Sequence, residues 1–242
     1  MRVLCYAQTN IGSGRDNNED NYYCNGTFKR DAAVPVAEAA AEQEGKRLIY
    51  GVFDGMGGEA NGEQAALLCA QTLHRCSSDE PFDALDFFRR ANVAVCDIIA
   101  ASGQVSGSTA ATVHLTGNHA YCCNVGDSRA YRVGAERLER ITRDHSVVEG
   151  LIESGNITAE QARTHPNRNL ITRALGPEEH IECDVYDVLL CSDGLVVTAT
   201  DEEMYEAVAR GDTPAESLEH LLELSKQRGA PDNVTAVLLY QE

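Results

Sequence analysis

The chain has 242 residues and a formal net charge of −18 at pH 7. This charge excludes a general affinity for nucleic acid or anionic lipid, because most of the surface would repel phosphate groups. No apolar run approaches the roughly eighteen residues that a membrane-spanning helix needs, and the N-terminal residues lack the apolar stretch of a signal peptide. We therefore expect a globular cytoplasmic protein that binds neither nucleic acid nor membranes.

Apolar periodicity predicts the secondary structure in chain order. The predicted elements are strands over 2–8 and 47–53, helices over 62–76 and 82–101, strands over 109–115, 120–124 and 129–133, a helix over 147–154, a strand over 185–191, helices over 201–209 and 214–228, and a strand over 234–240. Residues 116–118 are predicted to turn between two strands as a hairpin. Residues 29–46, rich in alanine and glutamate, are interpreted as an exposed loop or a short helix.

The helix predicted over 82–101 has a clear apolar face. Its members, which recur at helical spacing and are expected to be buried, are Leu85, Phe88, Val95, Ile98 and Ile99. Along the whole chain, strands come in blocks rather than in strict alternation with helices, which favours an α+β fold over a doubly wound parallel sheet. No linker or repeat divides the sequence, so a single domain over 1–242 is predicted.

The chain has nine cysteines, and no C-x-x-C pair occurs among them. Several stand in apolar surroundings, as in "ALLCAQ" and "DVLLCSDG". Buried free thiols are therefore favoured over disulfides or a zinc site. The histidines do not offer a soft metal site either, because none is spaced as H-x-x-x-H.

Aspartates recur beside glycine or asparagine at the ends of predicted strands. The segments are "GRDNNED" at 14–20, "FDGMGG" at 53–58, "NVGDSR" at 124–129, "CSDG" at 191–194 and "APDNVT" at 230–235. Each alone has a plain explanation, since Asp-Gly is a common turn and Asp or Asn readily caps a backbone amide. Together they predict a cluster of oxygen ligands at one sheet edge, which suits magnesium or manganese better than zinc.

Arg15 adds a cation to this acidic group. It stands four residues before Glu19 and five before Asp20. Its guanidinium is suited to bind a phosphate above the metals through two parallel hydrogen bonds. A surface ion pair with one of those acids is the alternative, and the spacing leaves both open.

A set of longer motifs runs in order along nearly the whole chain: "GRDNNED", "YGVFDGMGGEANGEQAA", "GSTAATVHL", "NVGDSRAYRV", "ITRDHSVVEGLIESGNIT", "HPNRNLITRALG", "LLCSDGL" and "GAPDNVTAVLL". In these motifs the chain resembles the metal-dependent protein phosphatases of the type 2C family, in particular their compact bacterial members. The resemblance implies a four-layer α-β-β-α sandwich with two central antiparallel sheets. It also implies a serine/threonine protein phosphatase that hydrolyses phosphoserine and phosphothreonine and depends on Mn²⁺ or Mg²⁺.

The resemblance assigns metal ligands residue by residue. Asp54 is similar to the carboxylate that bridges two cations, and the backbone carbonyl of Gly55 is expected to bind one of them. Asp193 and Asp232 correspond to ligands of the second cation. Asp20 is expected to join the cluster directly or through a bound water.

Other roles are implied for residues around these ligands. Glu19 is expected to orient a metal-bound water, and Arg15 matches the arginine that binds the substrate phosphate. Asp127 matches the aspartate that holds a third, weaker metal in bacterial relatives. The segment over 147–168 corresponds to a small flap, and its sequence independently predicts two short helices that break at Gly155-Asn156, with Thr158 as a cap.

The resemblance further implies direct attack on phosphorus by a hydroxide held between two cations, with no phosphoenzyme. Eukaryotic relatives have a histidine in this turn, with the sequence "DGHGG". This chain has "DGMGG" instead, and Met56 cannot donate a proton. The proton for the leaving alkoxide is then expected from metal-bound water, and His145 is a poorer candidate because it is expected to fix local structure.

Two other functions are weighed beside this one. A metal-dependent hydrolase of a small phosphorylated molecule would use the same site with a different entrance. A catalytically inactive binding module would keep the fold without the ligands, and the presence of Asp20, Asp54, Asp193 and Asp232 counts against it. Phosphorylated proteins, among them a serine/threonine kinase, are the expected partners, and a monomer is expected.

Overall fold

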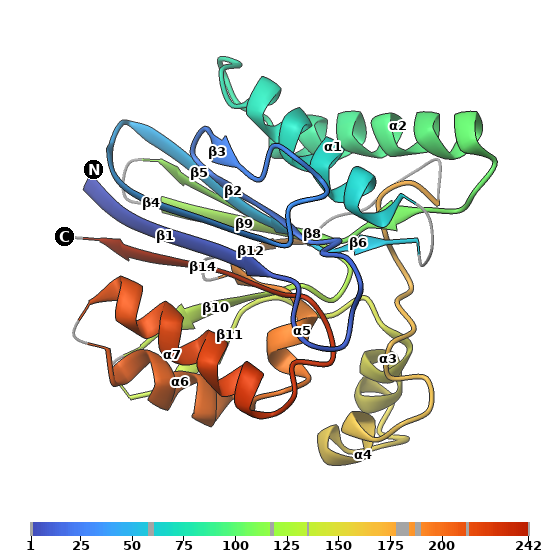
Figure 1. The fold of residues 1–242 in the computed structure, drawn as a ribbon, viewed down its shortest axis with the longest axis vertical. Helices are drawn as coiled ribbons and strands as arrows, with labels where there is room; N and C mark the ends of the chain where they lie inside the picture. Colours follow the sequence, from blue (N-terminus) through green and yellow to red (C-terminus); the bar gives the residue numbers. More distant parts are fainter. Residues whose placement is uncertain are drawn as a thin grey trace.

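Two antiparallel sheets form the centre of the protein (Figure 1). The computed structural model describes residues 2–57, 61–116, 119–134, 136–177, 184–186, 190–211 and 213–241. The first sheet has the order β11 (Leu138–Arg140), β10 (Arg129–Val133), β13 (Leu190–Cys191), β14 (Val234–Gln241), β1 (Arg2–Asn10) and β4 (Val36–Glu44). The second has the order β12 (Asp184–Tyr186), β9 (His119–Val125), β8 (Ala110–Thr116), β5 (Arg47–Phe53), β2 (Asn21–Cys24) and β3 (Thr27–Phe28). A short pair, β6 (Gly55–Met56) and β7 (Gly107–Ser108), extends one end.

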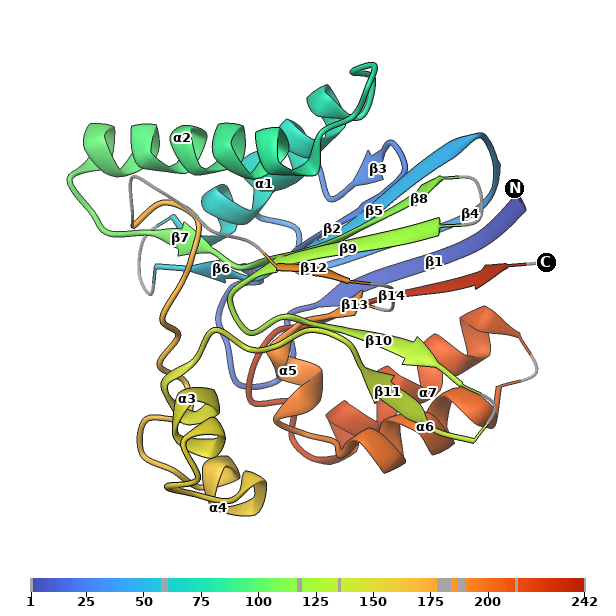
Figure 2. The ribbon, with the colours of Figure 1, turned by 180° about the vertical axis from the view of Figure 1, so that it is seen from behind.

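Helices cover the outer face of each sheet, so the predicted four-layer α-β-β-α sandwich is confirmed (Figures 1 and 2). Helices α1 (Gly62–Cys76) and α2 (Ala84–Ser102) lie over the second sheet. Helices α5 (Asp193–Val196), α6 (Asp201–Ala209) and α7 (Pro214–Gln227) lie over the first. Helices α3 (Val147–Glu153) and α4 (Ala159–Arg163) stand apart, at the end of the sandwich opposite to the two termini.

Three apolar cores fill the spaces between these layers. Between the sheets lie side chains such as Tyr50, Val52 and Val237, which alternate along their strands with residues that face outward. The aromatic rings of Phe53 and Phe87 are buried under α1 and α2. The third core, under α6 and α7, is made of Met204, Leu221, Leu222 and their neighbours. None of the described helices is both long and apolar enough to cross a membrane.

The interpretation of residues 29–46 as a loop or short helix is wrong, because nine of them form strand β4 at the edge of the first sheet. This strand pairs antiparallel with β1, for example Ala40 with Tyr6. Every second residue of β4 is exposed and the others are half-buried. Alanine and glutamate rarely favour strands, and pairing with β1 overrides that preference.

Two further expectations need correction, and a third is confirmed as far as the structure describes it. The strand predicted over 185–191 is divided into β12 and β13, which belong to different sheets. In α2, which begins at Ala84, Leu85 is 46% exposed. The helix buries a different face, which includes Phe87, Phe88 and Val95. The strands around the predicted hairpin pair as expected, but Gly117 and Asn118 of its turn lie outside the described residues.

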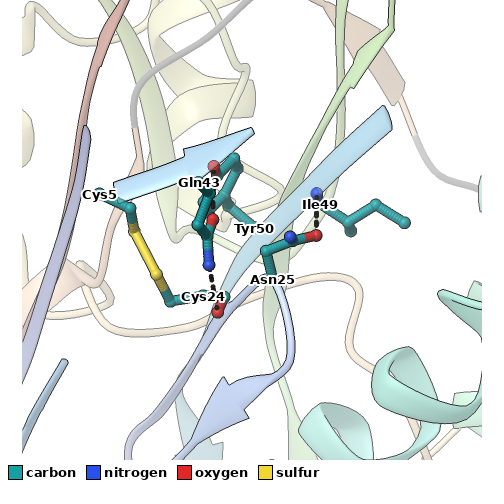
Figure 3. Close-up of a disulfide and its surroundings, with 6 residues drawn as sticks. All are labelled: Cys5, Cys24, Asn25, Gln43, Ile49 and Tyr50. Atoms are coloured by element: carbon teal, nitrogen blue, oxygen red, sulfur yellow. Dashed lines mark hydrogen bonds between the residues drawn. A yellow bond between two sulfur atoms is a disulfide. The ribbon is translucent and has the colours of Figure 1, made fainter. Parts of the chain in front are cut away.

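Among the cysteines that the structure describes, two form a disulfide, Cys96 is a half-buried thiol and the other thiols are buried. Cys5 of β1 and Cys24 of β2 form a disulfide between the two sheets (Figure 3), which contradicts the expectation of free thiols for this pair. The two residues meet only because β1 and β2 face each other, so their sequence spacing carried no sign of the bond. Cys69 and Cys191 are buried thiols as predicted, and burial raises the pKa of each to about 12. Cys183 lies outside the described residues.

Candidate metal centre

The predicted aspartates come together at the end of the sandwich where β1, β5 and β13 finish and β14 begins. Asn233 fastens two of these segments to each other. Its Nδ2 donates hydrogen bonds to the carbonyl oxygens of Ile11 (2.9 Å) and Asn17 (3.1 Å), and its Oδ1 accepts one from the Glu19 amide (2.9 Å). The loop that carries Arg15, Glu19 and Asp20 is thereby held against the start of β14.

Asp54 leaves the end of β5 and is fixed by the start of β8. The Thr109 amide donates to the Asp54 carbonyl at 2.8 Å, and the Asp54 amide donates to Thr109 Oγ1 at 3.2 Å. Gly55 packs directly on backbone, because a Cβ there would lie 2.1 Å from the carbonyl oxygen of Gly62 and 2.6 Å from that of Glu19. Only glycine allows this approach.

Asp193 begins α5, directly after β13. The Ser192 amide donates to the Thr235 carbonyl at 2.8 Å, and the Thr235 amide donates to Ser192 Oγ at 2.9 Å. Thr235 also donates its hydroxyl to the carboxylate of Asp20, which is 1% exposed. The carboxyl groups of Asp54 and Asp193 hydrogen-bond to each other.

The electrostatics of this cluster favour the binding of protons or cations to its carboxylates. Burial first, and the charges of neighbouring aspartates next, raise the pKa of Asp54 well above its usual value. Burial likewise raises the pKa of Asp193, and it raises the pKa of Asp20 to about 7. Several carboxylates without water or counterions are unstable together, so a bound cation would relieve the repulsion that these values record.

The donor set fits Mg²⁺ or Mn²⁺, because all the converging groups are carboxylate or carbonyl oxygens. Within the described residues, no three His, Cys, Asp or Glu side chains already form a group of metal ligands. Asp54 and Asp193 share a hydrogen bond instead, and Asp232 is paired with Arg15. A divalent cation would take the place of these contacts between side chains.

Arg15 Nη2 lies 2.7 Å from Asp232 Oδ2, and its side chain is 45% exposed. The hydrogen bond to Asp232 raises the pKa of Arg15. The structure thus shows the ion pair that the spacing left open, although with Asp232 rather than with Glu19 or Asp20. The pair also brings the guanidinium to the mouth of the carboxylate cluster.

Asp127 stands on the turn between β9 and β10, and the flap begins beside it. The His145 amide donates to the Gly126 carbonyl at 2.9 Å, and the Gly126 amide donates to His145 Nδ1 at 3.2 Å. Burial, followed by the charges of Asp193 and Asp144, raises the pKa of Asp127 well above its usual value. His145 therefore holds the turn that carries Asp127, which is the structural role expected for it.

Glu19 and Met56 flank the cluster. The Glu19 side chain is buried, accepts a hydrogen bond from Asn17 Nδ2 at 3.4 Å, and has its pKa raised chiefly by burial. Met56 pairs with Gly107 in the short β6–β7 sheet, and its Cε would lie 3.0 Å from a Cβ at Gly107. The thioether thus packs against β7 and has no proton to offer.

Sequence reasoning missed the residues that hold the ligands in place. Asn233, Ser192 and Thr235 fall inside the motifs, but their hydrogen bonds become visible only in the fold. No sequence pattern indicated that Lys29 is buried. It is 2% exposed, it donates from Nζ to the Asn18 carbonyl at 2.7 Å, and burial lowers its pKa to about 8.

The flap confirms its sequence prediction. Helices α3 and α4 are separated around Gly155 and Asn156, as expected. Thr158 caps α4 through a capping box, in which its hydroxyl accepts the Gln161 amide and Gln161 Oε1 accepts the Thr158 amide at 2.8 Å. This reciprocal pair is a strong start signal for a helix.

Comparisons with known proteins agree with this geometry. The family model described as Protein phosphatase 2C matches residues 6–150. The chain is 36% identical over 98% of its length to the serine/threonine protein phosphatase PstP of Mycobacterium tuberculosis, but it spans only 45% of that relative. It is 27% identical to the serine/threonine phosphatase stp of Listeria monocytogenes, over 97% of this chain and 94% of the relative.

A solved structure shows the same architecture. The catalytic domain of PstP in complex with two manganese ions matches with a TM-score of 0.78 and 33% identity, over 99% of this chain and 98% of that one. The match therefore spans both sheets. On these matches and motifs, the chain belongs to the protein phosphatase 2C family.

Proposed function

We propose that this chain is a metal-dependent phosphatase of phosphoserine and phosphothreonine in proteins. The observation that carries the proposal is the cluster of carboxylates at the strand ends, in which Asp20 is buried and Asp54 and Asp193 are half-buried, with the guanidinium of Arg15 beside it. Family membership and the names of the relatives support it.

Two divalent cations, Mn²⁺ or Mg²⁺, would lower the pKa of water and offset the charge of a phosphoryl group when bound. We infer that the carboxylates of Asp54, Asp193 and Asp232 and the backbone carbonyl of Gly55 would hold them. Asp20 is inferred to complete the cluster, since Thr235 already orients its carboxylate. Asp127 is proposed to hold a third, weaker cation.

Arg15 is proposed to bind the phosphate of the substrate. Its bond to Asp232 has to be given up for this, which is reasonable for a side chain that is nearly half exposed. A planar guanidinium then offers two donors to the phosphoryl oxygens. Glu19, buried beside the cluster, is proposed to orient the attacking water.

The leaving alkoxide needs a proton. Met56 has none, and both ring nitrogens of His145 are occupied, Nδ1 by the Gly126 amide and Nε2 by Arg173 Nη1 at 3.3 Å. We therefore infer that water supplies this proton. The remaining proposals are that residues 1–242 act as a single catalytic domain with the flap at 147–168, as a monomer in the cytoplasm, on phosphoproteins that include a serine/threonine kinase.

The test compares substrates of two sizes. Phosphate release from phosphoserine and phosphothreonine peptides is measured beside release from small phosphorylated metabolites, with Mn²⁺, with Mg²⁺ and with a chelator. We expect metal-dependent hydrolysis of the peptides at a higher kcat/KM than of the metabolites. Hydrolysis of metabolites alone would instead identify a small-molecule hydrolase, and no release with either metal would identify a binding module.

A further inference from the structure

The flap is held in place without a hydrophobic core of its own. Helix α3 has no buried residue, and α4 buries only Ala162. Most helical stability in proteins comes from packing an apolar face, but the apolar residues of α3, among them Val148, Leu151 and Ile152, are only half-buried. Polar contacts with the body of the protein therefore carry a larger share in holding α3 in place.

Among the residues that the structure describes, two ion pairs join the side chains of α3 to the body. Arg140 Nη2 lies 2.6 Å from Glu149 Oε1, and Arg143 is paired with Glu153. Both arginines belong to the body, at β11 and just after it, and both glutamates lie on α3, four residues apart. They therefore stand on one face of the helix.

Arg140 is the better anchored of the two arginines. Its Nε donates to the Thr142 carbonyl at 2.8 Å, and its Nη2 lies 3.7 Å from Asp144 Oδ1. Asp144 in turn accepts three hydrogen bonds from Arg129, of 2.9, 3.0 and 2.6 Å. The Arg140 and Glu149 side chains are 25% and 16% exposed, whereas those of Arg143 and Glu153 are 52% and 43% exposed.

The series of charged side chains that runs from Glu149 through Arg140 and Asp144 to Arg129 ends beside the candidate metal centre. Arg129 follows Asp127 by two residues, and the root of the flap is bonded to Gly126 through His145. A shift of α3 would therefore change the space next to Asp127. Under the proposed function, a phosphoprotein would bring a polypeptide close to that space, whereas a small aryl phosphate would not.

We propose that Arg140 is a positioning residue that locks the flap through Glu149 and thereby sets the affinity for phosphoprotein substrates. The pair of Arg143 with Glu153 adds a smaller share, because both of its side chains are more exposed to solvent. The effect on substrates rests on the proposed phosphatase function, whereas the lock itself does not.

The kinetic test uses Arg140→Met, which keeps the length of the side chain and removes its charge. We expect the KM for a phosphothreonine peptide to rise about threefold to tenfold, with kcat nearly unchanged and with the KM for p-nitrophenyl phosphate unchanged. Arg140→Lys should restore part of the peptide KM. Glu149→Gln should produce a similar rise, and the double variant should add nothing to it.

Arg137→Met is the matched control. Arg137 lies just before the same strand and pairs with Glu139 at 3.1 Å, and neither residue belongs to the flap. This variant should leave both KM values unchanged. An Arg140→Met variant that behaves like Arg137→Met, or that alters both substrates equally, would overturn the proposal.

Amide hydrogen exchange measures how firmly Arg140 holds α3, and the measurement needs no substrate. In Arg140→Met the amides of 150–153 should exchange about threefold to tenfold faster, while those of β5 and β8 should not change. Unchanged exchange in α3 would refute the lock even if KM moved. If the wild-type chain released no phosphate from peptides, the proposed function would fail, and exchange would still decide whether Arg140 holds the flap.

Discussion

The metal centre and the flap lie at the same end of the molecule but are built in opposite ways. At the metal centre, backbone, threonine and asparagine groups fix each acidic residue, and Gly55 leaves no space for even a methyl group. In the flap, a Cβ added at Gly150 or Gly155 would meet nothing within 4 Å. In one region hydrogen bonds and close packing fix carboxylates that repel one another, whereas ion pairs and half-buried side chains hold the other.

Under the proposed function, this difference would separate catalysis from substrate selection. Catalysis by bound cations would require ligands that keep their geometry although their charges repel one another. Selection among protein substrates tolerates, and often uses, a movable element. Variants in the two regions should therefore differ in kind as well as in size.

The largest effect is expected at the carboxylates. Asp54→Asn and Asp193→Asn should each lower metal-stimulated phosphopeptide hydrolysis by more than about a hundredfold, because loss of a mere outer-shell partner of a metal ligand already costs 10–100-fold. Glu153→Gln in the flap should lower it by less than about threefold. Phosphate release at saturating Mn²⁺ measures both, and full activity in either aspartate variant would refute the metal assignment.

The second effect concerns stability and pH. The pKa of Asp20 is raised from 3.8 to about 7 in the folded chain, so the folded state binds this proton more tightly than the unfolded state. With a chelator present, the free energy of unfolding should therefore be highest near pH 4 and should fall as the pH rises to about 7. Urea unfolding at pH 5 and pH 7 measures this difference, which we expect to reach a few kcal/mol.

Asp20→Asn is the control for this pH dependence. The variant has no carboxylate to protonate at that position, so part of the fall in stability should disappear. Mn²⁺ should stabilise the wild-type protein more at pH 7 than at pH 5, since the cation competes with protons for the same oxygens. A stability that rose with pH over this range would contradict the assignment.

The third prediction compares the effect on stability of replacing two different glycines. Gly55→Ala should destabilise the protein by about 3 kcal/mol, because its Cβ would lie 2.1 Å from the Gly62 carbonyl oxygen, which belongs to the backbone. Gly150→Ala in α3 should stabilise that helix by about 1 kcal/mol, since the space is open and alanine favours helices. Thermal unfolding measures the first, and amide exchange in the flap the second. Equal effects of the two variants would erase the contrast between the regions.

Sequence reasoning reached furthest where a motif or a period carried the information. The bounds of β5, β10, α1 and α6 agree with their predictions, and Thr158 caps α4 as its sequence predicted. Strand β4 was missed because its alanines and glutamates favour neither face strongly. The Cys5–Cys24 bond, the hydrogen bonds of Asn233 and the burial of Lys29 depend on contacts between distant segments, and no local pattern announces them.

The smallest effect is expected at Met56, which lies between the metal ligands and the short β7 strand. If water supplies the leaving-group proton, the thioether contributes only packing against Gly107. Met56→Leu, which nearly conserves volume, should then change kcat by less than about threefold and leave the pH–rate profile in place. Met56→His adds a group that titrates near pH 6.5, and it should add a new limb to that profile only if proton delivery limits the rate. A tenfold loss in Met56→Leu would mean that the methionine does more than fill space, and the source of the proton would have to be sought in what it positions.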